Sequence, residues 1–182
     1  INSTTVKTTI SQIIHWSFAV FLITMLSVGF YMKNTVYDPD IYQLHKMFGV
    51  LFCLLVVGRV LWRIKTPWQS SAINTKQENL VHLTHLSLII LMVLMPITGF
   101  MISAFIGFGI HLFGFFIVPE FFNATGEIAP LHNGIYQTAK WLHEIFAYCF
   151  SLLIITHISA ALKHHFIDKD TTLLRMIKLP KN

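Results

Sequence analysis

The chain has 182 residues, of which 54% are hydrophobic and only 12% are charged, and its mean hydropathy is +0.64. Soluble domains carry about 25% charged residues, so this composition excludes an ordinary soluble domain and indicates an integral membrane protein. The formal net charge of +5 could indicate nucleic-acid binding, but in a membrane protein it is better explained by cationic loops that flank the spans. We therefore expect no nucleic-acid partner.

A spanning helix requires about 20 apolar residues, and four runs meet this requirement. Their predicted bounds are 10–32, 42–62, 80–105 and 138–161. We therefore predict an all-α membrane protein, a four-transmembrane-helix bundle that forms a single membrane domain over residues 1–182. The first run is too long for the apolar part of a signal peptide, so we expect it to remain as an anchor.

The segments between these spans are polar, with one exception. Residues 33–41 form a turn with an Asp-Pro pair, and residues 66–79 form a polar loop. The segment 106–137 is apolar but is interrupted by glycines and by Pro119. We expect it to be an extended outer loop between the third and fourth helices, re-entrant or lying in the interface over one mouth of the bundle.

Positive charges are distributed unevenly between the two sides of this bundle. Ten of the thirteen Lys and Arg residues fall on the side that holds both termini, and the other side has only Lys33, Lys46 and Lys140. The positive-inside rule therefore predicts that both termini are cytoplasmic and that the 106–137 loop faces outward.

Histidines occur inside the predicted spans at matched depths. His143 and His157 are fourteen positions apart on the fourth span, which is about 21 Å along an α-helix, and their side chains leave nearly the same face. An imidazole within a span is costly and needs a partner. His15 enters the first span near the inner side and His45 the second near the outer side, so the topology pairs His15 with His157 and His45 with His143.

Each pair can supply two imidazoles to one metal, His15 and His157 to an inner haem iron and His45 and His143 to an outer haem iron. Haem is large, flat and apolar, and helix bundles often hold it in their core. The sequence has no C-x-x-C-H motif, so two haem b groups would be bound non-covalently. Taken singly, each histidine can also be an ordinary polar residue at a membrane interface.

Three glycines are candidates for contact with a flat ring. Gly49 lies one turn after His45 on the same helical face, where a missing side chain lets a ring approach the backbone. Gly29 and Gly58 are candidates for the same role near the other end, although small residues also mediate helix packing.

Cationic and further histidine residues complete the candidate set. Arg59 is expected near the inner haem and can pair with a propionate, or it can be an ordinary inner-side anchor. Lys140 precedes His143 by three residues and can hold an outer propionate or attract an anionic substrate; the alternative is a lysine that extends to the membrane surface. His82 and His85, one turn apart at the start of the third span, are further candidate ligands.

Several segments of the chain resemble the bacterial cytochrome b561 family. The similarity covers residues 11–176 and is carried by IIHW around His15, LHKMFG around His45, VVGRVLWR, HLTHL, WLHE and THISAALKHHFIDKDTTLLRM. The resemblance implies a four-helix protein of the bacterial inner membrane with two haem b groups. It also implies that their ligands are His15, His45, His143 and His157.

The best-characterised activity in this family is oxidation of superoxide with transfer of the electrons to ubiquinone, so the resemblance makes this the leading hypothesis. Superoxide would donate one electron at the outer haem, and two haems would hold the two electrons that a quinone needs. Lys33, Lys46 and Lys140 can steer the anion, although nearby acidic residues offset them. The alternative is a cytochrome b subunit that passes electrons between the quinone pool and a periplasmic redox partner. A haem carrier or a non-redox scaffold is a third possibility.

Overall fold

Four long helices make up most of the protein. The computed structural model describes residues 3–65, 78–112 and 114–177. The helices are α1 (Ser3–Asn34), α2 (Pro39–Lys65), α3 (Glu78–Ile106) and α4 (Asn133–Phe166). Each is long and apolar enough to cross a membrane and contains one predicted span, so the predicted set of four helices is confirmed. The predicted loop 66–79 lies outside the described residues, apart from its last two.

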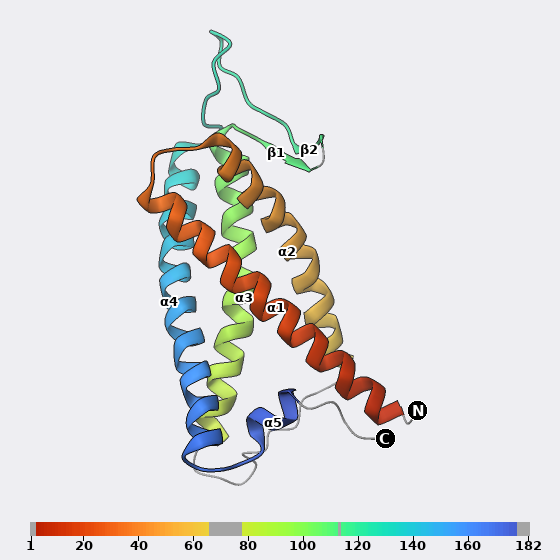
Figure 1. The fold of residues 1–182 in the computed structure, drawn as a ribbon. Coiled ribbons are helices and arrows are strands. Elements are labelled where there is room, and N and C mark those ends of the chain that lie inside the picture. The colour runs from red at the N-terminus through yellow and green to blue at the C-terminus, as the bar shows by residue number, and fades with distance from the viewer. Residues whose placement is uncertain (1–2, 66–77, 113, 178–182) are drawn as a thin grey trace.

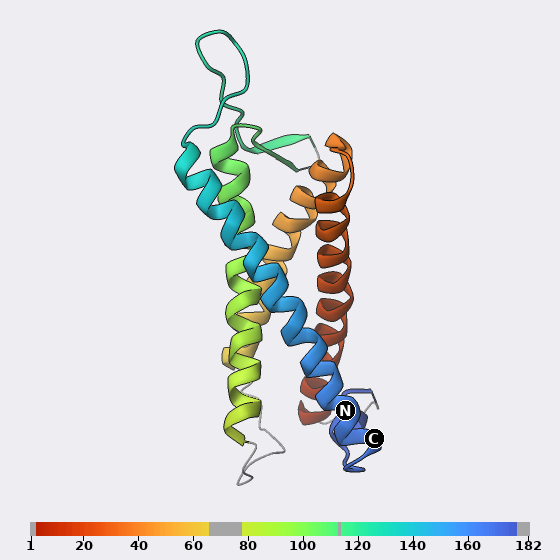
Figure 2. The same ribbon diagram turned by 90° about the vertical axis from the view of Figure 1, so that its left-hand side faces the viewer.

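The helices pack as a bundle in which α3 lies between α2 and α4, and α1 packs against α2. The start of α1 and the short helix α5 (Thr172–Ile177) lie at the same end of the bundle (Figure 1). We call this the α5 end. The opposite end carries the segment that joins α3 to α4 and is called the hairpin end (Figures 1 and 2).

All four helices contribute to a small core at the middle of the bundle. Its buried members are Phe18, Phe52, Val56, Leu91, Met92 and Phe150. Within this core the rings of Phe21 and Phe52 stack with centroids 5.5 Å apart. Many other large apolar side chains point away from the bundle, and Leu54 and Leu152 are 64% and 63% exposed. Such extended apolar surface is typical of a membrane contact, which is consistent with a multi-pass membrane protein.

Side-chain caps determine where two of the helices begin. Asp38 directly precedes the proline that opens α2, and its side chain accepts a hydrogen bond from the backbone N–H of Asp40 at 2.9 Å. An aspartate cap followed by a proline is a favourable start for a helix. At α4, Nδ1 of His132 accepts from the N–H of Ile135 at 3.2 Å. This cap starts α4 at Asn133, five residues before the predicted bound.

The segment 106–137 contains a β-hairpin that the sequence analysis did not predict. Strand β1 (Ile110–Leu112) pairs antiparallel with strand β2 (Phe115–Val118). Gly109 leads into β1 with a φ of +60°, and a Cβ at this position would lie 2.5 Å from the carbonyl oxygen of Val118. Only glycine fits such a site, so the entry into the hairpin depends on it.

Two side chains of α2 hold this hairpin in place. The side-chain amide of Gln43 donates to the carbonyl oxygen of His111 at 3.0 Å, and Nζ of Lys46 donates to the carbonyl oxygen of Gly109 at 3.3 Å. Ile110 is only 2% exposed. The predicted outer loop is therefore an ordered structure next to the first turns of α2, where His45 lies.

Helix α5 is a second element that the sequence analysis did not predict. The side-chain amide of Gln12 donates to the carbonyl oxygen of Arg175 at 2.6 Å. The indole N–H of Trp16 donates to the carbonyl oxygen of Met176 at 2.8 Å. Both bonds join α5 to α1 on either side of His15, so the tail folds back beside this histidine.

Candidate functional site

The four histidines of the predicted constellation come together as two cross-helix pairs. His15 of α1 and His157 of α4 have ring centroids 6.4 Å apart. His45 of α2 and His143 of α4 have ring centroids 6.5 Å apart. The first pair lies towards the α5 end and the second towards the hairpin end, in the combination that the topology predicts.

Both separations fit one metal ion held between two imidazoles. An imidazole nitrogen bonds a transition metal at about 2.0–2.1 Å and lies about 1.2 Å from its ring centre, so two such ligands on opposite sides of a metal have ring centres about 6.4–6.6 Å apart. The pairs at 6.4 Å and 6.5 Å lie within this range. The donor set, two neutral imidazoles from facing helices, also fits haem iron.

Thr98 of α3 orients one of these histidines, and the sequence analysis missed it. Nδ1 of His143 lies 2.9 Å from Oγ1 of Thr98. The hydroxyl proton is directed to the carbonyl oxygens of Leu94 and Met95, each 3.0 Å away, so Nδ1–H of His143 donates to the hydroxyl. This assignment leaves Nε2 of His143 as the nitrogen with a free lone pair. The only signal in the sequence is a threonine inside an apolar span.

Glycines of two neighbouring helices lie against the imidazoles at the hairpin end, and the missing side chain of Gly99 makes room for His143. A Cβ added at Gly99 of α3 would lie 3.2 Å from Cε1 of His143, and one added at Gly29 of α1 would lie 3.6 Å from Cε1 of His45. The expectation that Gly29 serves the inner centre is therefore wrong, because α1 runs towards the hairpin end and carries Gly29 to His45. Nδ1 of His45 is buried and has no hydrogen-bond partner among the described residues.

The other two candidate glycines meet little of the surrounding protein. A Cβ at Gly49 or at Gly58 would have no described heavy atom within 4 Å, apart from its own helix and chain neighbours. The helix face at Gly49, one turn after His45, therefore has space for a flat ring.

The α5 end carries a third histidine and an arginine. His85 of α3 has its ring centroid 5.4 Å from that of His157, which is too close for the two to bind one metal from opposite sides. Its Nδ1 lies 2.7 Å from the carbonyl oxygen of Val81. His82 points elsewhere, with Nε2 3.7 Å from a carboxylate oxygen of Glu78.

Arg59 lies at the same end of the bundle on α2, with its guanidinium 5.7 Å from the centre of the Phe18 ring.

The three lysines at the hairpin end have different surroundings. Lys33 forms an ion pair with Glu144, the residue after His143, and donates to the hydroxyl of Tyr148 at 3.0 Å. Lys46 holds the hairpin, as described above, and lies over the ring of Phe108. Lys140 is exposed. The charge of Lys33 is therefore neutralised by Glu144, and the position of Lys46 is fixed by its hydrogen bond to the hairpin.

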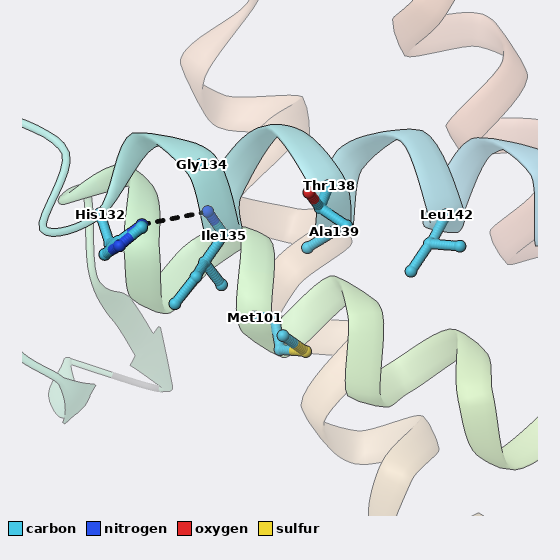
Figure 3. Close-up of a pocket in the computed structure, with 7 residues that line it drawn as sticks. All are labelled: Met101, His132, Gly134, Ile135, Thr138, Ala139 and Leu142. Atoms are coloured by element: carbon cyan, nitrogen blue, oxygen red, sulfur yellow. Dashed lines mark hydrogen bonds between the residues drawn. The ribbon is translucent and has the colours of Figure 1, made fainter.

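A separate cavity of about 360 Å³ lies between α3 and the start of α4 (Figure 3). Its lining includes Met101 of α3 and His132, Ile135 and Leu142 around α4. None of the four paired histidines lines it, so this cavity is distinct from the two histidine centres.

Comparison with known proteins gives matches along almost the whole chain. A family model described as prokaryotic cytochrome b561 matches residues 7–179. Cytochrome b561 homolog 2 of Escherichia coli K12 is 34% identical over 174 residues, covering 92% of this chain and 89% of that protein. Cytochrome b561 homolog 1 of the same organism is 29% identical over 172 residues, with coverages of 90% and 92%. The probable superoxide oxidase CybB of Yersinia pestis is 29% identical over 177 residues, with coverages of 90% and 91%.

Proposed function

Because the chain belongs to the prokaryotic cytochrome b561 family of membrane electron-transfer proteins, we propose that it oxidises superoxide and passes the electrons to ubiquinone. The family implies haem b as the cofactor. The relative from Yersinia pestis is named a probable superoxide oxidase, which supports this choice of substrate.

The two histidine pairs are the observation on which the proposal rests. His15 and His157 would hold one haem b non-covalently, and His45 and His143 would hold a second. Bound haem supplies one-electron redox chemistry. Both histidines of each pair would be taken up in holding the haem, so superoxide would need only to come close enough to give up an electron.

The reaction balances when two superoxide anions are oxidised for each ubiquinone that is reduced. Two superoxide anions each lose one electron and become two molecules of oxygen. The two electrons, together with two protons taken from water, reduce one ubiquinone to ubiquinol. His143 and His157 are about 21 Å apart along α4, so the two pairs provide one electron-accepting centre near each surface of the bilayer.

Charge supports an orientation for this reaction. The excess of Lys and Arg at the α5 end favours cytoplasmic termini in the bacterial inner membrane and a hairpin end that faces the periplasm. Lys46 and Lys140 would then attract superoxide from the periplasm, whereas Lys33 is neutralised by Glu144. At the α5 end, Arg59 would pair with a haem propionate.

The test uses the purified holoprotein in nanodiscs with a short-chain ubiquinone. A pulse of superoxide should produce the absorbance bands of reduced haem b and then ubiquinol. The variant His45→Ala should lose the rapid reduction because it lacks the periplasmic centre. Failure of the wild-type protein to respond to superoxide, with turnover only when a periplasmic protein is added, would contradict the proposal and favour the cytochrome b subunit described above.

A further inference from the structure

Strand β2 presents an unusual surface at the hairpin end. Phe115, Phe116 and Ile117 follow one another and are 76%, 60% and 48% exposed. Because side chains alternate across a strand, both faces of β2 are apolar and largely exposed, and the ring of Phe116 contacts only that of His111 among the described aromatic rings, with centroids 4.2 Å apart. A strand of this kind with water on both sides would be an aggregation site, so the surface requires a partner.

The position of the hairpin is fixed by the protein beneath it. The bonds from Gln43 and Lys46 hold β1 on α2, and the buried Ile110 anchors the same strand. Figures 1 and 2 both show the hairpin level with the ends of the helices, whereas the segment 119–132 projects beyond them. The apolar side chains of β2 are therefore held at the depth where the spans end.

The apolar surface of β2 continues the membrane surface of the bundle. No Asp, Glu, Lys or Arg occurs between Glu78 and Glu120, so the chain passes from α3 through the hairpin without a charged side chain. On the neighbouring first turns of α2, Leu44 and Phe48 are 48% and 41% exposed. The hairpin thus lies beside exposed apolar side chains of the predicted second span.

We propose that β2 lies in the headgroup layer of the bilayer and that Phe115, Phe116 and Ile117 contact phospholipid. Aromatic side chains favour this layer. The hydrocarbon interior is excluded, because a two-stranded hairpin has unpaired backbone groups along its edges that need water. This inference requires only that the protein spans a membrane, and it does not depend on the proposed substrate.

Lipid contact would also position the hairpin over the nearer histidine pair. The two side chains that bind the first half of the hairpin, Gln43 at His111 and Lys46 at Gly109, flank His45 in the sequence. A hairpin held by α2 on one side and by lipid on the other is a fixed cover beside that histidine.

The test measures the depth of single nitroxide labels on the holoprotein, with one molecule in each phosphatidylcholine–phosphatidylglycerol nanodisc. Labels are attached to Phe115→Cys or Ile117→Cys after replacement of Cys53 and Cys149 by alanine. The matched control is Ala124→Cys, an exposed position in the projecting segment. Power saturation then compares collisions with oxygen, which concentrates in lipid, and with a water-soluble nickel chelate.

We expect both hairpin labels to collide several-fold more with oxygen, relative to the nickel chelate, than the Ala124 label does. Equal ratios at all three positions would place the hairpin in water and overturn the inference. Weak collisions with both reagents at the hairpin positions would show that protein covers the surface, and would overturn it as well. A haem spectrum identical to that of the wild type establishes that each variant is folded, and the two hairpin positions report independently.

Discussion

Replacement of Thr98 by valine tests how the protein tunes the histidine pair at the hairpin end. Thr98 is 4% exposed, and valine has nearly the same shape, so packing is preserved. The variant loses the hydroxyl that accepts the Nδ1–H of His143 at 2.9 Å. A hydrogen bond of this kind increases the basicity of a ligating histidine, which stabilises the oxidised metal more than the reduced one. Its loss should therefore raise the potential of one haem.

The size of this change follows from the buried hydrogen bond. An intramolecular hydrogen bond contributes about 0.5–1.5 kcal/mol, and the Met95 carbonyl stays within reach of His143 in the variant, so the effect on the two oxidation states differs by no more than this amount. A difference of about 0.5–1.4 kcal/mol corresponds to about 20–60 mV for one electron, since tenfold in equilibrium is about 59 mV. Spectroelectrochemical titration of the purified protein should show one of two components shifted upward by this amount.

Two control variants separate this effect from a general disturbance of α3. Thr84→Val makes the same substitution on the same helix, where the hydroxyl donates to the carbonyl oxygen of Leu80 at 2.9 Å, and should leave both potentials unchanged. Thr98→Ser retains the hydroxyl and should restore the wild-type titration. Unchanged potentials in Thr98→Val, or an equal shift in Thr84→Val, would refute the assigned role of Thr98.

Three further predictions concern the ligands, the core and the hairpin. His45→Ala should remove one haem per chain and His157→Ala the other, so difference spectra of the two variants should lack different components. Phe150→Ala should destabilise the protein by about 3–5 kcal/mol, because it opens a cavity at a side chain that is 1% exposed, and thermal unfolding should begin at a lower temperature. Gly109→Ala should release the hairpin, because its Cβ would overlap the strand, and limited proteolysis should then cut near β1. Gly58→Ala, at a helical glycine where an added Cβ meets no described atom within 4 Å outside its own helix, should be cut no faster than the wild type.

Two results would contradict these expectations. Loss of the same spectral component in both histidine variants would show that the pairing of the four histidines is wrong. Equal proteolysis of the two glycine variants would show that the close contact at Gly109 does not fix the hairpin.

The four helices could be predicted from the sequence because a span of about 20 apolar residues is a local property. The histidine pairing also followed from sequence, since the direction of each helix sets the depth of each histidine. The depth of Gly29 was predicted less well. It was expected near the inner centre, but it lies beside His45.

The hairpin and Thr98 were not predicted because both depend on contacts between distant parts of the chain. The strands are short and are held by Gln43 and Lys46, more than sixty positions away. The apolar segment around Gly109 and Gly114 indicated an interfacial element, but no local pattern specified strand pairing. Likewise, the contact of Thr98 with His143 can be identified only when the rotation of α3 relative to α4 is known.

The haem content of the purified protein tests the central claim most directly. We predict two haem b groups per chain by the pyridine haemochrome assay, with low-spin resonances of two bis-histidine centres in the electron paramagnetic resonance spectrum. A single haem per chain, or a high-spin centre with an open coordination position, would contradict the assignment of His15 with His157 and His45 with His143.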